Sequence, residues 1–100
     1  MKAVLAGTVI AEADDADLIS IEGNWYFPLT SVAPGVLVES PTPYTCPWKG
    51  EAQYYSAVVD GELYKDAAWG YPRPYPSAQE RVGKDISGHI AFSPSVEVGP

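Results

Sequence analysis

Three residues of this 100-residue chain, a lone cysteine, a nearby lysine and a lone histidine, have side chains that could share one catalytic site. Cys46 is the only cysteine, and Lys49 follows it three positions later. An ammonium group placed near a thiol lowers the pKa of the thiol and makes it a better nucleophile. His89 is the only histidine and can act as an acid or a base near neutral pH. One hypothesis is therefore an enzyme in which Cys46 is the nucleophile, Lys49 its activator and His89 the acid or base.

The same residues also have a simpler interpretation. A lone cysteine is more often a small buried hydrophobe, and no second cysteine stands at the C-x-x-C spacing of self-resolving redox motifs. A histidine in a strand-like segment such as residues 88–92 is more often an ordinary strand residue than a catalytic one. One cysteine and one histidine fall short of the four ligands that a structural zinc ion needs, so we predict no metal site and no cofactor.

Aromatic residues provide the stronger signal. Trp48 follows Cys46 closely, and a second group at residues 69–72 reads WGYP. Strand alternation places Trp69 and Tyr71 on one face, and it turns the adjacent Tyr54 and Tyr55 to opposite faces. Aromatic walls stack planar ligands or surround cations, although an aromatic-rich core is the alternative. We predict a pocket at whose edge Cys46 lies and to which His89 contributes a polar contact, with these ligand-binding residues: Trp48, Lys49, Tyr55, Trp69 and Tyr71.

Two further hypotheses rest on weaker patterns. Asp14, Asp15 and Asp17 resemble the carboxylates that hold Mg²⁺ in phosphoryl and nucleotidyl transfer, but a solvated acidic loop is the simpler interpretation. The chain has neither G-x-x-x-x-G-K-[ST] nor G-x-G-x-x-G. The alternating prolines of Pro72–Pro76 favour polyproline II, which an interaction module would present to a partner.

Composition limits the classes of partner. The net charge of −7 argues against nucleic acid, since phosphates repel such a surface. No apolar run approaches the roughly 20 residues of a membrane span, and the short apolar start is not a signal peptide. One cysteine forms no internal disulfide. We expect a cytoplasmic protein, monomeric or homodimeric, whose partner is a small molecule.

Short β-branched runs, turn pairs, ten prolines and nine glycines predict an all-β, mostly antiparallel single domain over residues 1–100. Hairpin turns are expected at Gly23-Asn24 and Asp60-Gly61. At most one or two short helical turns are expected, at Leu29–Val32 and at Ser77–Arg81 with Ser77 as the cap. Local strand order favours a meander or half-barrel. The expected strands are Lys2–Leu5, Thr8–Ala13, Leu18–Glu22, Trp25–Phe27, Val36–Glu39, Glu51–Val59 (the longest), Glu62–Tyr64, Asp66–Tyr71, Ser87–Phe92 and Val96–Val98.

Five segments carry a resemblance to a known family. They read EGNWYFP at 22–28, TCPWKG at 45–50, VVDGE at 58–62, DAAWGYP at 66–72 and GHIAF at 88–92. In this order they resemble the domain of unknown function 427 family, also labelled nucleotidyltransferase-type, whose members are mostly small bacterial proteins. The resemblance implies a fold similar to the β-tent or Mss4-like group. That group includes zinc-binding proteins, B-type methionine sulfoxide reductases and the tryptophan-cage domain of cereblon.

Two features of those relatives do not carry over to this chain. It lacks the paired C-x-x-C motifs that bind zinc, and it lacks the carboxylate and glycine-rich signatures of nucleotidyltransferases. The leading prediction is therefore a small-molecule-binding module with an aromatic pocket. The alternatives are the Cys46 enzyme and a nucleotidyltransferase-type activity.

Overall fold

A computed structural model describes residues 1–100 of the chain. It confirms an all-β, antiparallel fold with one short α-helix and two 3-10 turns, while the β-tent assignment stays a prediction. The helical segments are η1 (Asp15–Asp17), η2 (Leu29–Ser31) and α1 (Pro76–Val82). The strands are β1 (Lys2–Leu5), β2 (Thr8–Glu12), β3 (Ile19–Ile21), β4 (Asn24–Pro28), β5 (Leu37–Ser40), β6 (Thr45–Cys46), β7 (Gly50–Glu51), β8 (Gln53–Val59), β9 (Glu62–Gly70), β10 (His89–Phe92) and β11 (Glu97–Gly99).

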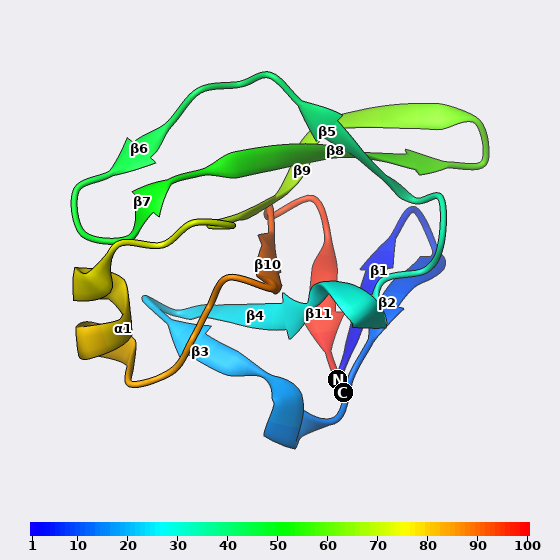
Figure 1. Cartoon of the computed structure of the whole chain (residues 1–100). Helices are drawn as coiled ribbons and strands as arrows, with labels where there is room; N and C mark the ends of the chain where they lie inside the picture. The colour runs from blue at the N-terminus through cyan, green and yellow to red at the C-terminus, as the bar shows by residue number, and fades with distance from the viewer.

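The strands form three sheets. Their orders are β11-β1-β2, β3-β4-β10-β9-β8-β5 and β6-β7. The meander expected from local order is wrong, because β10 lies between β4 and β9 (Figure 1), β11 pairs with β1, and β5 lies at the edge beside β8 rather than next to β4. Strand β10 therefore joins the β3–β4 hairpin to the β8–β9 hairpin within one sheet.

Tight two-residue turns set the register of the hairpins. The two central residues of each turn have positive φ, as a type I′ turn requires, and glycine is always the second. The turn predicted at Gly23-Asn24 lies one residue earlier, because Glu22 takes the first left-handed position and Asn24 begins β4. The three turns are Ala6-Gly7, Glu22-Gly23 and Asp60-Gly61.

The two central strands differ from the expected boundaries. The predicted strand Glu51–Val59 is interrupted at Ala52, so its first residue belongs to the β6–β7 hairpin. The returning strand is instead continuous from Glu62 to Gly70 and is the longest. A β-bulge interrupts this strand at Asp66, which has φ +53°, and the register with β8 shifts between Tyr55 and Ala57. The bulge explains why the sequence pattern predicted two separate strands here.

Side chains hold this bulge in place. The Ser40 and Thr42 hydroxyls donate to the Asp66 carboxylate at 2.6 and 2.7 Å, and the Asp66 N–H donates to Ser56 Oγ at 3.2 Å. Those hydroxyl donors lower the pKa of Asp66 below its usual value. The positive φ at a non-glycine residue is thus balanced by hydrogen bonds that no sequence periodicity reveals.

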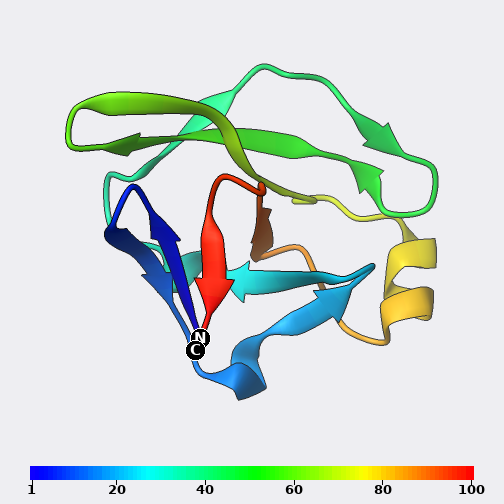
Figure 2. The same ribbon diagram turned by 180° about the vertical axis from the view of Figure 1, so that it is seen from behind.

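Apolar side chains form two separate clusters, one on each side of the large sheet. Phe27 and Ile90 belong to the first cluster, between that sheet and β1, β2 and β11. Their chain neighbours Tyr26 and Ala91 belong to the second cluster, which Ala78 of α1 covers. This is the alternation that a strand buried on both faces requires. Figure 2 shows the three-stranded sheet and α1 at opposite ends of the molecule. No helix here has the length and apolar character needed to cross a membrane.

Candidate functional site

The segment around Cys46 is a short hairpin pressed against the chain that leads into α1. β6 and β7 place Cys46 opposite Gly50. Gly50 has φ +114°, and a Cβ there would lie 3.3 Å from the backbone of Arg73 and of Tyr75, so only glycine fits without displacement. The Tyr75 N–H donates to the Lys49 carbonyl at 3.1 Å. The hairpin loop is therefore fixed in position rather than free to close over a substrate.

Ser77 has a different role from the one predicted. Its hydroxyl donates to the Trp48 carbonyl at 2.7 Å, and Tyr75, not Ser77, is the N-cap residue of α1. Pro76 occupies the first helical turn, where its missing N–H costs nothing. The polyproline segment Pro72–Pro76 thus anchors the hairpin through its backbone and then becomes the start of a helix.

Cys46 lies in the second apolar cluster with only 5% of its surface exposed. Its companions there include Tyr26, Tyr71 and Ala78. Its thiol makes no hydrogen bond, and no side-chain hydrogen bond or ion pair joins it to Lys49 or His89. The structure does not bring the three residues of the enzyme hypothesis together as a connected set.

Lys49 carries the charge at the centre of a polar and aromatic group that we call the Lys49 cluster: Glu22, Tyr26, Trp48, Lys49 and Tyr71. The ammonium group lies 5.2 Å from the Trp48 ring centroid and 5.0 Å from that of Tyr71. It donates to the Glu22 carboxylate. Burial disfavours its charge, but the hydrogen bond to Glu22 and the nearby phenols outweigh burial and raise its pKa. Lys49 is therefore a cation at neutral pH, neither a base nor a nucleophilic amine.

The two tyrosines of the cluster stay protonated. Burial raises the pKa of Tyr71 to about 12, although the Lys49 charge opposes that shift. Burial also raises the pKa of Tyr26, whose hydroxyl accepts a hydrogen bond of 3.2 Å from the Trp69 indole N–H. Tyr26 thereby links the Lys49 cluster to Trp69.

The Lys49 cluster is filled by its own side chains. Arg81 of α1 lies 4.9 Å from the Trp48 ring centroid, so Trp48 has a cation on it from Lys49 and another from Arg81. None of the cavities in the structure is lined by Trp48, Lys49 or Tyr71. The aromatic surface that the sequence suggests for a ligand is here occupied by the chain's own ammonium and guanidinium groups.

The other residues predicted for the site do not lie together. Tyr55 packs against the first apolar cluster, whereas Tyr54 lies beside Trp69 with ring centroids 6.2 Å apart. His89 pairs with Pro28 in the sheet, and its Nδ1 is buried without a hydrogen-bond partner. Among the five residues predicted to bind a ligand, only Trp69 lines a cavity.

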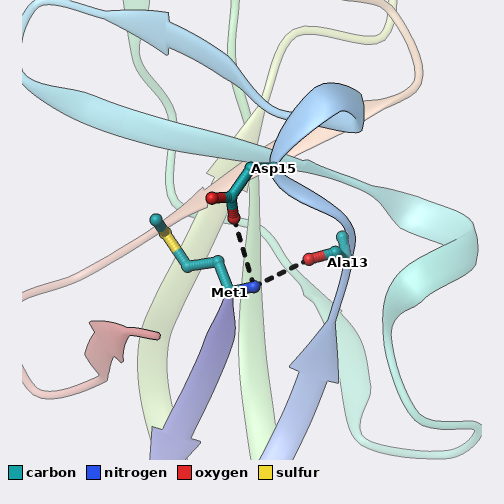
Figure 3. Close-up of polar contacts among 3 residues, drawn as sticks. All are labelled: Met1, Ala13 and Asp15. Atoms are coloured by element: carbon teal, nitrogen blue, oxygen red, sulfur yellow. Dashed lines mark hydrogen bonds and ion pairs between the residues drawn. The ribbon is translucent and has the colours of Figure 1, made fainter.

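The acidic loop is partly engaged by the start of the chain. Figure 3 shows the Met1 amino group donating to the Ala13 carbonyl at 2.9 Å and to the Asp15 carboxylate at 3.4 Å. Asp14 and Asp17 border a separate cavity of about 330 Å³. No group of three His, Cys, Asp or Glu side chains is placed to hold a metal ion.

The largest cavity, about 500 Å³, is a groove that we call the β4–β10 groove. Trp25, missed by sequence reasoning, and Trp69 provide its aromatic surface, and Trp25 is 43% exposed. The sequence did offer one indication of its exposure: Trp25 lies near a hairpin turn, and strand alternation places it on the opposite face from Tyr26. No residue with an ionisable side chain lines the groove. The lining residues are Gly23, Asn24, Trp25, Trp69, Phe92, Ser93, Pro94, Val96 and Val98.

The groove exists because two neighbouring strands separate. β4 and β10 pair at Pro28↔His89 and Phe27↔Ile90, and the pairing ends there. Beyond that point β4 continues beside β3, while β10 continues beside β9. Trp25 lies on one diverging strand and Phe92 on the other, so the opening between the strands is lined from both sides.

Comparison with known proteins agrees with the sequence resemblance. Residues 1–99 match the family described as a domain of unknown function (DUF427), and the chain belongs to that family. A search of curated proteins gave no match.

Proposed function

We propose that the protein is a small-molecule-binding module and that the β4–β10 groove takes a neutral, planar ligand. The observation that carries the proposal is the opening between β4 and β10, with an exposed Trp25 on one side and Trp69 on the other. The prediction of an aromatic binding surface is retained, but its place moves from the Lys49 cluster to this groove.

Size and chemistry both favour this class of ligand. A volume of about 500 Å³ lies within the usual range for ligand sites in proteins. Indole rings offer large flat surfaces for stacking. Because no ionisable side chain lines the groove, a charged ligand would lose its hydration without gaining a counter-ion. The net charge of −7 opposes anions further.

The Lys49 cluster supports the groove without lining it. Glu22, the partner of Lys49, directly precedes Gly23 at the groove wall. Tyr26, which accepts from the Trp69 indole, directly follows Trp25. The second contact holds the Trp69 indole against a residue of β4, which reduces the cost of ordering that ring on binding.

The test uses nicotinamide as the neutral planar probe and nicotinate as its anionic counterpart. Binding is followed by ¹H–¹⁵N NMR at probe concentrations around 1 mM, since fragments bind with Kd values of about that size. We expect nicotinamide to shift the Trp25 and Trp69 indole signals and nicotinate to shift them much less. Trp25→Ala should abolish the response, because it removes one stacking surface from a side chain that is largely exposed.

The matched control is Leu63→Ala, which truncates an exposed apolar side chain on β9 that does not line the groove. It should leave the nicotinamide response unchanged. A panel of neutral planar probes that leaves both indole signals unmoved would refute the proposal. Equal responses to nicotinamide and nicotinate would refute the preference for neutral ligands.

A further inference from the structure

Where β4 and β10 separate, both segments remain regular β-strands, and only the edges that face each other are unpaired. β4 keeps its pairing with β3 as far as Asn24↔Ile21, and β10 keeps its pairing with β9 as far as Phe92↔Ala68. Each strand is therefore held extended by its outer neighbour. Continuing the register of Phe27↔Ile90 would place Trp25 opposite Phe92, but no pairing forms there.

Hydrogen bonds on either side of the opening establish which main-chain groups face it. In an antiparallel strand the N–H and C=O of one residue point to the same side, and the side alternates along the chain. The Leu29 N–H donates to the Gly88 carbonyl at 2.8 Å, so the backbone groups at 27 and 25 turn toward β10. The Ser93 N–H donates to Ala67 of β9 at 2.8 Å, so the groups at 92 turn toward β4.

The main-chain groups of Trp25 and Phe92 thus face each other across the groove. Neither residue takes part in the backbone hydrogen bonds made by loops, turns and caps. Phe92 as a whole residue is 6% exposed, and the part of it that lines the groove lies beside Ser93. Backbone donors and acceptors in such a position gain more than exposed ones from a ligand that satisfies them.

We propose that the groove recognises its ligand through the facing main-chain groups of Trp25 and Phe92. The ligand would then carry a hydrogen-bond donor next to an acceptor on one planar edge, as an amide does, and would take the place of the missing rungs of the ladder. This inference rests on the proposed function and narrows its ligand class. Asn24 and Ser93 also line the groove, but main-chain recognition of an amide-like edge does not require their side chains.

The experiment compares 2-pyridone, which has an adjacent N–H and C=O, with N-methyl-2-pyridone, which keeps the ring and carbonyl but lacks the donor. Amide hydrogen exchange is measured by NMR for Trp25 and Phe92, with the paired amides of Phe27 and Ile90 as internal references. In the free protein the first two should exchange faster than the references. Saturating 2-pyridone should slow exchange at whichever of the two amides donates to its carbonyl, and N-methylation should weaken binding about tenfold.

Each other result has a defined meaning. Equal affinity for the two pyridones, with unprotected Trp25 and Phe92 amides, would overturn this inference and leave the proposed function standing. Trp25 and Phe92 amides that already exchange as slowly as the references in the free protein would also overturn it. Loss of discrimination in Asn24→Ala or Ser93→Ala would assign recognition to side chains instead. No response to either pyridone or to nicotinamide would refute the proposed function itself.

Discussion

The ammonium group of Lys49 donates to the carboxylate of Glu22, and this contact connects the β6–β7 hairpin to the turn of the β3–β4 hairpin. The two residues differ in environment: the Lys49 side chain is 9% exposed and that of Glu22 is 56% exposed. Lys49 therefore bears most of the desolvation, while its partner can still reach water. The aromatic rings of Trp48 and Tyr71 supply the remaining stabilisation of the buried cation.

Lys49→Met is expected to reduce the free energy of unfolding by about 1–3 kcal/mol. Methionine keeps the apolar stem but removes the hydrogen bond to Glu22 and both contacts with aromatic rings. The loss is smaller than for a fully buried pair because Glu22 can turn to solvent. Urea denaturation followed by tryptophan fluorescence measures the change. Lys65→Met, at an exposed lysine of β9, is the control and should change stability by less than about 0.5 kcal/mol.

Alkaline pH should destabilise the protein because the folded state holds protons that the unfolded chain releases. The folded-state pKa values of Lys49, Tyr26 and Tyr71 are all raised, so their contribution is complete below about pH 10. It is lost as pH rises from about 10 toward the folded pKa of Tyr71, about 12. Unfolding free energies measured between pH 8 and 11.5 should fall steeply above pH 10.

Tyr71→Phe should flatten that alkaline decline by about 1–2 kcal/mol, because phenylalanine has no proton to release. Tyr44→Phe, at an exposed tyrosine, is the control and should keep the wild-type profile. An unchanged profile in Tyr71→Phe would contradict the role assigned to this phenol.

Gly70→Ala tests how closely β9 approaches β10. A Cβ at this position would lie 2.7 Å from the His89 carbonyl oxygen and 3.1 Å from Ile90 Cγ2, so the strands would have to move apart. We expect a loss of about 1–3 kcal/mol in unfolding free energy. Gly88→Ala is the matched control: nothing lies within 4 Å of its Cβ, and its stability should be unchanged or slightly higher. Equal effects of the two substitutions in urea denaturation would refute the close approach.

Cys46 should resist alkylation in the native state, since it is buried among Tyr26, Tyr71 and Ala78. Iodoacetamide labelling followed by mass spectrometry should show at least about a hundredfold slower reaction than in denaturant. Cys46→Ala should be tolerated better than Cys46→Ser, because an unpartnered hydroxyl in this cluster costs about 1–3 kcal/mol. Native labelling as fast as in denaturant would make the Cys46 enzyme the leading hypothesis.

Local features of the fold were predictable from the sequence, and long-range ones were not. Strands and hairpins follow from neighbouring residues, as at Asp60-Gly61 and Lys2–Leu5, where turn chemistry and alternation act within a few positions. The insertion of β10 between β4 and β9 depends on a partner about 60 residues away in the chain from β4, which alternation does not specify. The bulge at Asp66 depends on Ser40 and Thr42, which lie 26 and 24 residues away in the chain.

The candidate site shows the same limit. Sequence reasoning found the aromatic residues but assumed that neighbouring ones would leave room for a ligand. The structure places Lys49 between Trp48 and Tyr71, so those rings already have a cation. The groove instead involves Trp25 of β4 and Trp69 of β9, two strands that are brought into one sheet by β10 between them.

The position of β10 also has a consequence for synthesis on the ribosome. The hairpins on either side of β10 can form as soon as they emerge, but neither gains its shared neighbour until His89–Phe92 has left the exit tunnel. Until then the facing edges of β4 and β9 remain unpaired, and open strand edges invite aggregation. We expect nascent chains of this protein to stay sensitive to protease until His89–Phe92 has emerged, and to become resistant in a single step at that point.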